Sequence, residues 1–191
     1  MKFINRKDSS KVKGWTEKVL VDKNGNIKAM FHWNFLGRFI AKHFHKDLKI
    51  PYITGSWSTK PIIDNLVTTA GKGIISGQVN GVTTSPVTAI ALGIGTTAAA
   101  AGNTSLESES TTNGAERGAA TCTRQTTTTT NDTSQWVKTF TFTGSFAITE
   151  EGLFDNNTSG GNMLARQVFS AINVVTGDTL QITHKVVFAA A

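Results

Sequence analysis

The chain has 191 residues, of which 39% are hydrophobic and 17% are charged. This length suits one domain of moderate size, or a domain with an added arm, and the composition allows a folded core. Thr and Gly are abundant, and because β-branched Thr fits a pleated strand, a mainly β protein is favoured. The single cysteine, Cys122, excludes an intrachain disulfide. No apolar run reaches the length of a transmembrane helix, and the polar start predicts no secretory signal peptide.

Positive charge is concentrated in the first 50 residues. They hold 12 Lys and Arg against 4 Asp and Glu, whereas the remaining 141 residues hold 7 against 9, which together give the net charge of +6. A basic arm can meet nucleic acid, an anionic membrane or an acidic protein partner. We favour a solvated or partner-bound arm over nucleic-acid binding, and we expect no membrane partner.

The arm is predicted to contain a β-hairpin. Residues 13–22 alternate in the manner of a strand, with Trp15 on the same side as Val19 and Val21. Asn24-Gly25 follows, a common two-residue turn because both positions accept positive φ, and residues 27–33 return.

Residues 34–45 have helical spacing of their apolar side chains, so they form either a short amphipathic helix or an extended segment lying on a partner. The histidines nearby lack cysteine or carboxylate companions at ligand spacing, which favours surface histidines over a metal site. Aromatic residues among basic ones also occur in binders of single-stranded nucleic acid, but a protein-docking arm explains them equally well. The candidate docking residues are Trp15, Phe31, Trp33, Phe35, Arg38, Phe39, Lys42 and Phe44.

The body of the chain is predicted to follow a turn-rich connection that ends near Pro61. A helix is expected from about Thr68 to Gln78, capped by Thr68 or Thr69 and ended by Asn80-Gly81. Its three glycines weaken it, and a close approach to a sheet would account for them.

Short strands separated by turns make up the rest. They are expected at residues 88–94, with Ile94 inward, at 117–130, at 134–148, at 163–169 and at 179–188. The run 134–148 alternates aromatic and hydroxyl side chains and is predicted as one long strand. The predicted core residues share this period-2 parity: they are Trp136, Phe140, Phe142, Phe146, Leu180, Ile182 and Val186. Leu106 is expected to anchor the long loop 96–112.

These elements predict an antiparallel β-sandwich of Greek-key or jelly-roll character, with one short helix and a basic N-terminal arm. The expected division is residues 1–60 for the arm with its hairpin and connection, and residues 61–191 for the sandwich domain.

Charged residues inside apolar runs predict a structural ion pair rather than an active site. Glu150 (or Glu151) lies at a strand end and Arg166 lies within LARQVF, so a bidentate pair would fix neighbouring strands. His184 falls on an apolar face, which favours a core or interface histidine over a catalytic one. Catalytic and nucleotide-binding signatures are absent, and Gly93-x-Gly95 lacks the third glycine of a dinucleotide site. We therefore expect no enzyme activity, no catalytic residue, no metal and no cofactor.

Three stretches together resemble a known family. They are residues 65–72 (NLVTTAGK), residues 91–109 (ALGIGTTAAAAGNTSLESE) and residues 148–169, which begin ITEEGLFD and end MLARQVF. In this order they resemble small structural proteins of tailed bacteriophages, found as head-decoration, tail or fibre-associated β-domains. The resemblance covers about residues 62–188, and segment 34–50 departs from it.

The resemblance implies a virion protein, made in the host cytoplasm, whose partners are other capsid or tail subunits and further copies of itself in the particle. The first possibility is a capsid decoration or auxiliary protein docked through its N-terminal arm. The second is a tail, fibre or baseplate protein that presents loops 96–112 and 156–162 to a receptor. The third is a nucleic-acid-binding module that uses the basic arm.

Overall fold

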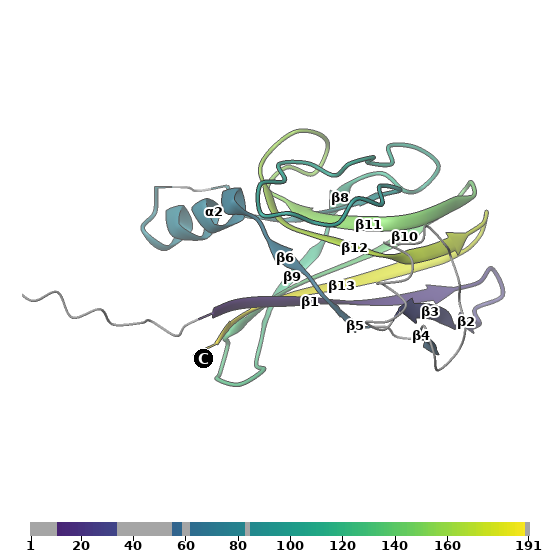
Figure 1. Ribbon diagram of the computed structural model, residues 1–191, viewed down its shortest axis with the longest axis horizontal. Helices are drawn as coiled ribbons and strands as arrows, with labels where there is room; N and C mark the ends of the chain where they lie inside the picture. The colour runs from purple at the N-terminus through teal and green to yellow at the C-terminus, as the bar shows by residue number, and fades with distance from the viewer. Residues whose placement is uncertain (1–10, 34–54, 59–61, 83–84, 190–191) are drawn as a thin grey trace, which may run out of the picture.

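The computed structural model describes residues 11–33, 55–58, 62–82 and 85–189, and it is mainly β. Two antiparallel sheets pack face to face, and the helix among the described residues lies at one end of the sandwich (Figure 1). The strands of the first sheet, in spatial order, are β2 (Ile27–Lys28), β1 (Lys11–Val21), β13 (Thr179–Ala189), β10 (Thr133–Thr141) and β9 (Thr121–Gln125), with β5 (Ile62–Asp64) also beside β1. The strands of the second sheet are β6 (Leu66–Val67), β12 (Met163–Val174), β11 (Phe146–Phe154), β7 (Ala89–Gly93) and β8 (Gly118–Ala119).

The strand connections are nested, as expected for a jelly-roll-like sandwich. β10 and β13 pair in the first sheet, whereas β11 and β12, which lie between them in the chain, pair in the second. The two crossovers between sheets are hydrogen-bonded to each other: Phe142 donates its N–H to Asp178 O at 3.0 Å, and Gly177 donates to Phe142 O at 2.8 Å. The predicted sandwich of two antiparallel sheets with a short helix is thereby confirmed.

The long strand predicted at residues 134–148 is wrong, because this run forms two strands in different sheets. β10 ends at Thr141 and β11 begins at Phe146, with Gly144 in the crossover between them. The alternation persists across the crossover because both strands turn the same parity toward the shared core. Periodicity alone therefore could not show the break.

Six of the seven predicted core side chains are buried between the sheets, which confirms the parity assignment for β10 and β13. Phe146 is only partly buried and packs against the rim of this core, with its ring centroid 6.1 Å from that of Phe142. Ile94 is 47% exposed rather than inward, because β7 ends one residue before it. Leu106 is 5% exposed, as its anchoring role requires.

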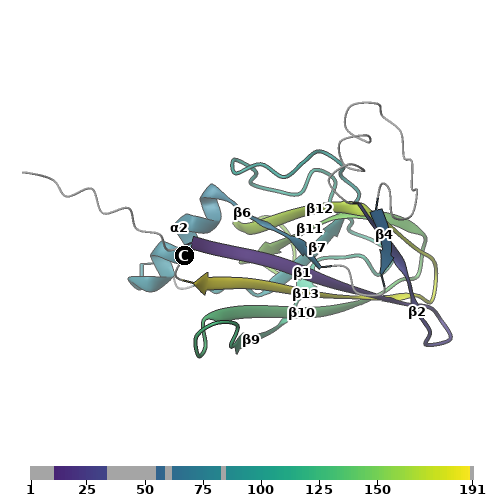
Figure 2. The same ribbon diagram turned by 60° about the horizontal axis from the view of Figure 1, so that its bottom comes forward.

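The predicted division into an arm (residues 1–60) and a sandwich (residues 61–191) does not match the described residues. β1 pairs with β13 along its whole length, from Lys11↔Ala189 to Val21↔Thr179. Its opposite edge pairs with β5 and β2, so it lies inside the first sheet, as Figure 2 shows. The expected hairpin exists, with β2 returning on β1 after Gly25 at φ +85°. It belongs to the sandwich, because a strand with partners on both edges cannot be a separable arm.

A short ribbon closes one end of the sandwich. β3 (Met30–Trp33) pairs antiparallel with β4 (Gly55–Ser58), and Met30 is buried in the main core. The last pair of this ribbon is Trp33↔Gly55. The backbones of Trp33 and Gly55 are therefore adjacent.

The helix α2 (Thr69–Val79) has the boundaries that the sequence predicts within one residue. Thr68 is the N-cap, and its hydroxyl accepts a hydrogen bond from Gly71 N at 2.8 Å. Asn80 is the C-cap and Gly81 follows with φ +74°. A Cβ on Gly71 would lie 2.1 Å from Leu164 O, which confirms the close approach to a sheet at this position; a Cβ on Gly73 would meet nothing within 4 Å.

These two glycines give a matched pair of substitutions. Gly71→Ala should lower the free energy of unfolding by about 1–3 kcal/mol, because the methyl group must displace the backbone of β12. Gly73→Ala should raise it by about 0.5–1 kcal/mol, since alanine restricts the unfolded chain and meets nothing in the folded one. Urea denaturation of both variants checks the prediction. Equal effects of the two substitutions would contradict the packing of α2 on β12.

Candidate functional site

A bulge in β11 decides which way its charged residues face. Consecutive residues of a strand lie on opposite faces of a sheet, and the register shift between Ile148 and Glu150 reverses which parity faces inward. Ile148 lies in the core between the sheets, and after the shift the odd-numbered Leu153 lies there instead. Glu150 faces outward, toward the loop that covers this sheet, and Glu151 faces the interior between the sheets. Both are fully buried. Two separate polar clusters result.

The outer cluster contains the ion pair that the sequence predicts. Arg166 donates from Nε to Glu150 Oε2 at 2.9 Å, and its Nη2 lies 2.7 Å from the same oxygen. Two nitrogens of the guanidinium therefore lie against one carboxylate oxygen, with only Nε placed to donate a hydrogen bond to it, instead of the expected two-oxygen fork. Its Nη1 donates to Asn103 Oδ1 at 3.0 Å, a contact with the covering loop.

Glu150 also organises the backbone of that loop. Its Oε1 accepts hydrogen bonds from Gly95 N at 3.0 Å and Ser108 N at 2.8 Å, and its Oε2 accepts one from Glu107 N at 3.1 Å. A buried carboxylate is costly unless its lone pairs are satisfied. Here one arginine and three backbone N–H groups satisfy them. The outer cluster is therefore a structural clamp that holds residues 95–108 on the sheet.

A second arginine, Arg117, holds other parts of the loops that cover the outer face of the second sheet. Arg117 makes a two-oxygen fork to Glu109 at 2.7 and 2.6 Å and donates to Gly160 O at 2.6 Å. Its guanidinium carbon lies 3.6 Å from the ring centroid of Phe154, in cation–π contact. A small apolar cluster lies beneath this cover: Ala89, Ala91, Leu106, Phe154 and Met163. The second sheet is therefore covered on both faces.

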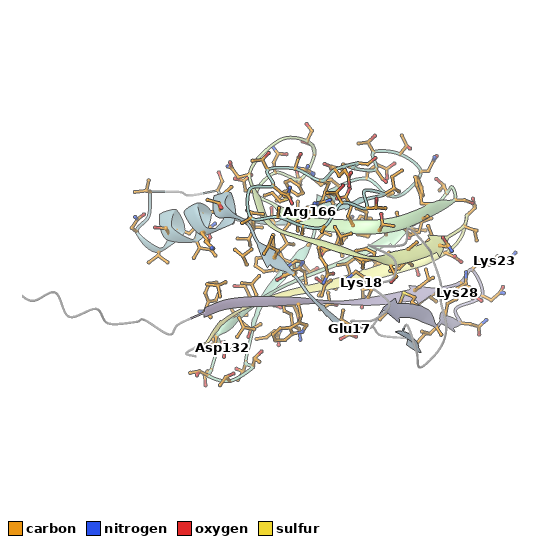
Figure 3. The ribbon with its side chains drawn as sticks, in the orientation of Figure 1. Glu17, Lys18, Lys23, Lys28, Asp132 and Arg166 are labelled. Carbon is orange, nitrogen blue, oxygen red and sulfur yellow. The ribbon has the colours of Figure 1, made fainter. Side chains whose placement is uncertain are left out.

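The inner cluster lies between the two sheets and joins four strands. Its members share nearly complete burial, at 2% exposure or less: they are Thr16 and Lys18 from β1, Glu151 from β11, Gln167 from β12 and His184 from β13. Figure 3 shows Lys18 in the layer between the sheets and Arg166 on the far side of the second sheet. Buried charges at such density are uncommon in a sandwich core.

His184 and Glu151 form the centre of this inner cluster. Nδ1 of the imidazole lies 3.0 Å from Glu151 Oε1 and 3.2 Å from Oε2, so the carboxylate fixes the proton on Nδ1. Thr16 donates its hydroxyl to Glu151 Oε1 at 2.9 Å. The Asn65 amide contacts Nε2 on the other side of the ring. It reaches this position because residue 14 is glycine, whose Cβ would stand 2.0 Å from Asn65 Oδ1.

Lys18 completes the inner cluster from the neighbouring strand. Its amine donates to Gln167 Oε1 and lies 4.2 Å from the ring centroid of Phe169. Burial lowers the pKa of Lys18 to about 8, although the nearby negative charge of Glu151 opposes this shift. Burial alone would raise the pKa of Glu151, but His184, Lys18 and Thr16 outweigh it and hold that pKa below its usual range. The carboxylate is therefore ionised at neutral pH.

The arrangement does not match nucleophilic catalysis on an external substrate. Thr16 and His184 both bind the same carboxylate, and the hydroxyl faces Nδ1 at 3.2 Å instead of a free ring nitrogen. With every member almost fully buried, a substrate from solvent has no contact with these groups. Chemistry here is restricted to the side chains of the cluster themselves.

The predicted docking residues are only partly described. Trp15 lies on the outer face of the first sheet, half-buried, with Lys185 Nζ 6.0 Å from its ring centroid. Phe31 and Trp33 belong to β3, and their side chains lie outside the description. The remaining candidates also lie outside the described residues: they are Phe35, Arg38, Phe39, Lys42 and Phe44.

The inner cluster could not be found from the sequence, apart from His184. Lys18 stands between Glu17 and Val19 in a strand of ordinary amphipathic pattern, so an inward lysine carried no signal. The one available signal was the parity of β13, which places His184 on the same face as Leu180 and Ile182. The sequence suggests Glu151 only as the alternative partner of Arg166, and the structure pairs it with His184 instead.

Comparisons with protein-family models, curated proteins and solved structures find no match to this chain. Among the described residues, no group of three or more His, Cys, Asp or Glu side chains is placed to hold a metal ion. The helix in the part of the chain that the structure describes is too short and too polar to cross a membrane.

The outer clamp can be tested by a double-mutant cycle with Glu150→Gln and Arg166→Met. We expect a coupling energy of about 2–3 kcal/mol, because each single change leaves a buried group without its partner. Lys28–Asp178 provides the matched control: its ions lie 2.7 Å apart, but the Lys28 side chain is 37% exposed. This control pair should couple by about 1 kcal/mol or less. Additive effects at Glu150 and Arg166 would contradict the clamp.

The inner cluster predicts a dependence of stability on pH. Because the folded-state pKa of Glu151 is below the unfolded value of 4.5, its contribution is fully present above pH 4.5 and is lost as the pH falls through the folded-state pKa. Glu151→Gln should remove this part of the acid sensitivity and lower stability near neutral pH. Denaturant midpoints measured across this range check the expectation, with exposed Glu116→Gln as the control that keeps the parental slope. A parental slope in Glu151→Gln would contradict it.

Proposed function

We propose that this chain is a non-enzymatic structural protein of a tailed-bacteriophage particle, most simply a decoration or auxiliary protein of the capsid. The resemblance of residues 65–72, 91–109 and 148–169 to such proteins is the starting point. The tail, fibre or baseplate location is the alternative within the same class.

The observation that carries the non-enzymatic part is how the buried charges are used. The described charged side chains that are buried engage other groups of the same chain: they are Lys18, Arg117, Glu150, Glu151, Arg166 and Asp178. The polar residues that reach loop 95–108 hold its backbone on the sheet. A sandwich whose buried charges serve its own packing suits a scaffold.

The docking element of this proposal is the segment 34–54 and not the whole of residues 1–50. β1 and β2 are paired within the sandwich, so they do not form a separate docking arm, and we place the docking role in segment 34–54. Segment 34–54 carries four Lys and Arg against one Asp, together with three Phe and one Tyr. Aromatic residues ringed by basic ones favour a pocket on a neighbouring subunit with acidic surroundings.

The β3–β4 ribbon allows a clean deletion test. Because Trp33 pairs with Gly55, an Asn-Gly turn can replace residues 34–54 without moving either strand. The shortened protein should unfold at the parental temperature but be absent from particles of the phage that encodes it, as measured by quantitative mass spectrometry. The control is Arg38→Gln with Lys42→Gln in the full chain, which should weaken incorporation without abolishing it if the aromatics supply most of the affinity.

The outcomes separate the alternatives. Normal incorporation of the shortened protein would overturn segment 34–54 as the docking element, and absence of the parent protein from particles would overturn the virion role. Hundreds of copies per particle indicate the shell, and a few to dozens indicate the tail. Salt-dependent binding of the parent, but not the shortened protein, to DNA would instead favour the nucleic-acid module.

A further inference from the structure

Lys18 has the surroundings of a reactive amine rather than those of an ordinary ion pair. It is fully buried, and no carboxylate lies within ion-pair distance of Nζ among the described residues; its hydrogen-bond partner is the neutral amide of Gln167. The face of Phe169 covers it at 4.2 Å. A buried lysine readily loses its proton and then becomes a nucleophile. With a pKa of about 8, roughly a tenth of such amines are neutral at pH 7.

The amide of Gln167 is held where this amine can reach its carbonyl carbon. Lys18 Nζ donates a hydrogen bond to Oε1, and Oε1 is bonded to Cδ, so the amine lies beside the carbonyl group that it would attack. Both side chains are at 2% exposure or less, so water does not compete for the carbon. When two reacting groups are held side by side in a fixed geometry without water, their reaction becomes effectively unimolecular. This lowers the barrier to the reaction of the Lys18 amine with the Gln167 amide.

A proton carrier stands beside the same amide. Glu151 is the register partner of Gln167 across β11 and β12, so their side chains lie next to each other on the inner face. Its charge also interacts with that of Lys18. Thr16 and His184 hold the carboxylate in place at 2.9 and 3.0 Å. Amine, amide and carboxylate therefore converge between the sheets.

The geometry points to an intramolecular isopeptide bond between Lys18 Nζ and Gln167 Cδ, formed spontaneously with Glu151 as the proton carrier. The neutral amine adds to Cδ, Glu151 takes a proton from Nζ and returns it to Nε2, and the bond from Cδ to Nε2 breaks. One amide is exchanged for another and one ammonia is released. No oxidant, reductant or cofactor is required.

Such a bond would tie the two sheets together covalently. Lys18 lies in the first sheet and Gln167 in the second, 149 positions apart in the chain. The loop closed by this bond would contain most of the sandwich. A cross-link that closes a long loop restricts the unfolded chain, as a disulfide does. Cysteine cannot supply this function, because the chain has only one. The inference does not depend on the virion role.

The primary test is the intact mass of the full-length protein under denaturing conditions. We expect a mass lower than the sequence mass by one ammonia, and tandem mass spectrometry should identify a branched peptide that joins Lys18 to Gln167. Succinimides at Asn24-Gly25, Asn80-Gly81 or Asn113-Gly114 would give the same mass loss. Mild alkali hydrolyses a succinimide and leaves the isopeptide intact, so the loss must survive that treatment.

Three variants assign the roles. Lys18→Met and Gln167→Ala remove the nucleophile and the electrophile, and Glu151→Gln removes the proton carrier; each should have the full sequence mass. Lys138→Met is the control, since Lys138 Nζ lies 4.6 Å from the Phe140 ring centroid, away from the cluster, and it should keep the ammonia loss. Variants without the bond should melt roughly 10 °C lower than the control.

The parent protein alone can overturn the inference, whatever the variants do. A full sequence mass after prolonged incubation near pH 8, where the amine is half neutral, means that the bond does not form. A branched peptide that joins other residues would overturn the assignment to Lys18 and Gln167. Persistence of the ammonia loss in Glu151→Gln would remove the carboxylate from the mechanism.

Discussion

The structure depends on two consecutive carboxylates of β11, which the pleat of the strand directs to opposite faces of the second sheet. The bulge before them sets Glu150 on the outer face and Glu151 on the inner one. Each carboxylate needs the partners on its own side, because Arg166 and the loop lie on one side of the sheet and His184 lies on the other. A buried carboxylate without partners costs several kcal/mol, roughly the size of half a domain's stability. The register of β11 is therefore strongly specified by charge as well as by hydrophobic contact.

The two clusters do different work. The outer one joins a long loop to the sheet: Glu150 accepts hydrogen bonds from three backbone N–H groups of this loop. The inner one joins strands, since Thr16 and His184 are register partners on β1 and β13, and both bind Glu151 on the opposite sheet. An apolar replacement of the inner cluster could be as stable, but it would define the facing of the sheets less uniquely.

This inner cluster also explains why the first described strand belongs to the sandwich despite its basic composition. β1 buries Thr16, Lys18 and Leu20 and turns Trp15 and Glu17 outward. Part of the positive charge of β1 therefore lies inside the sandwich, where Lys18 interacts with the negative charge of Glu151. Only the rest of its charge is available to a partner. The excess of positive charge over the first 50 residues overstates what any arm could present.

Local patterns determined much of this protein by themselves. Turn residues, caps and period-2 alternation located the helix, the hairpin after Gly25, the strand β13 and the main core, because these depend on neighbours in the chain. The ion pair of Glu150 and Arg166 was visible as two charges in apolar strands. Tertiary structure alone decided the break at Gly144, the place of β1 beside β13, and the meeting of Lys18 with Gln167. Each of these is a contact between distant residues, and periodicity reports which face a side chain takes but not what that face meets.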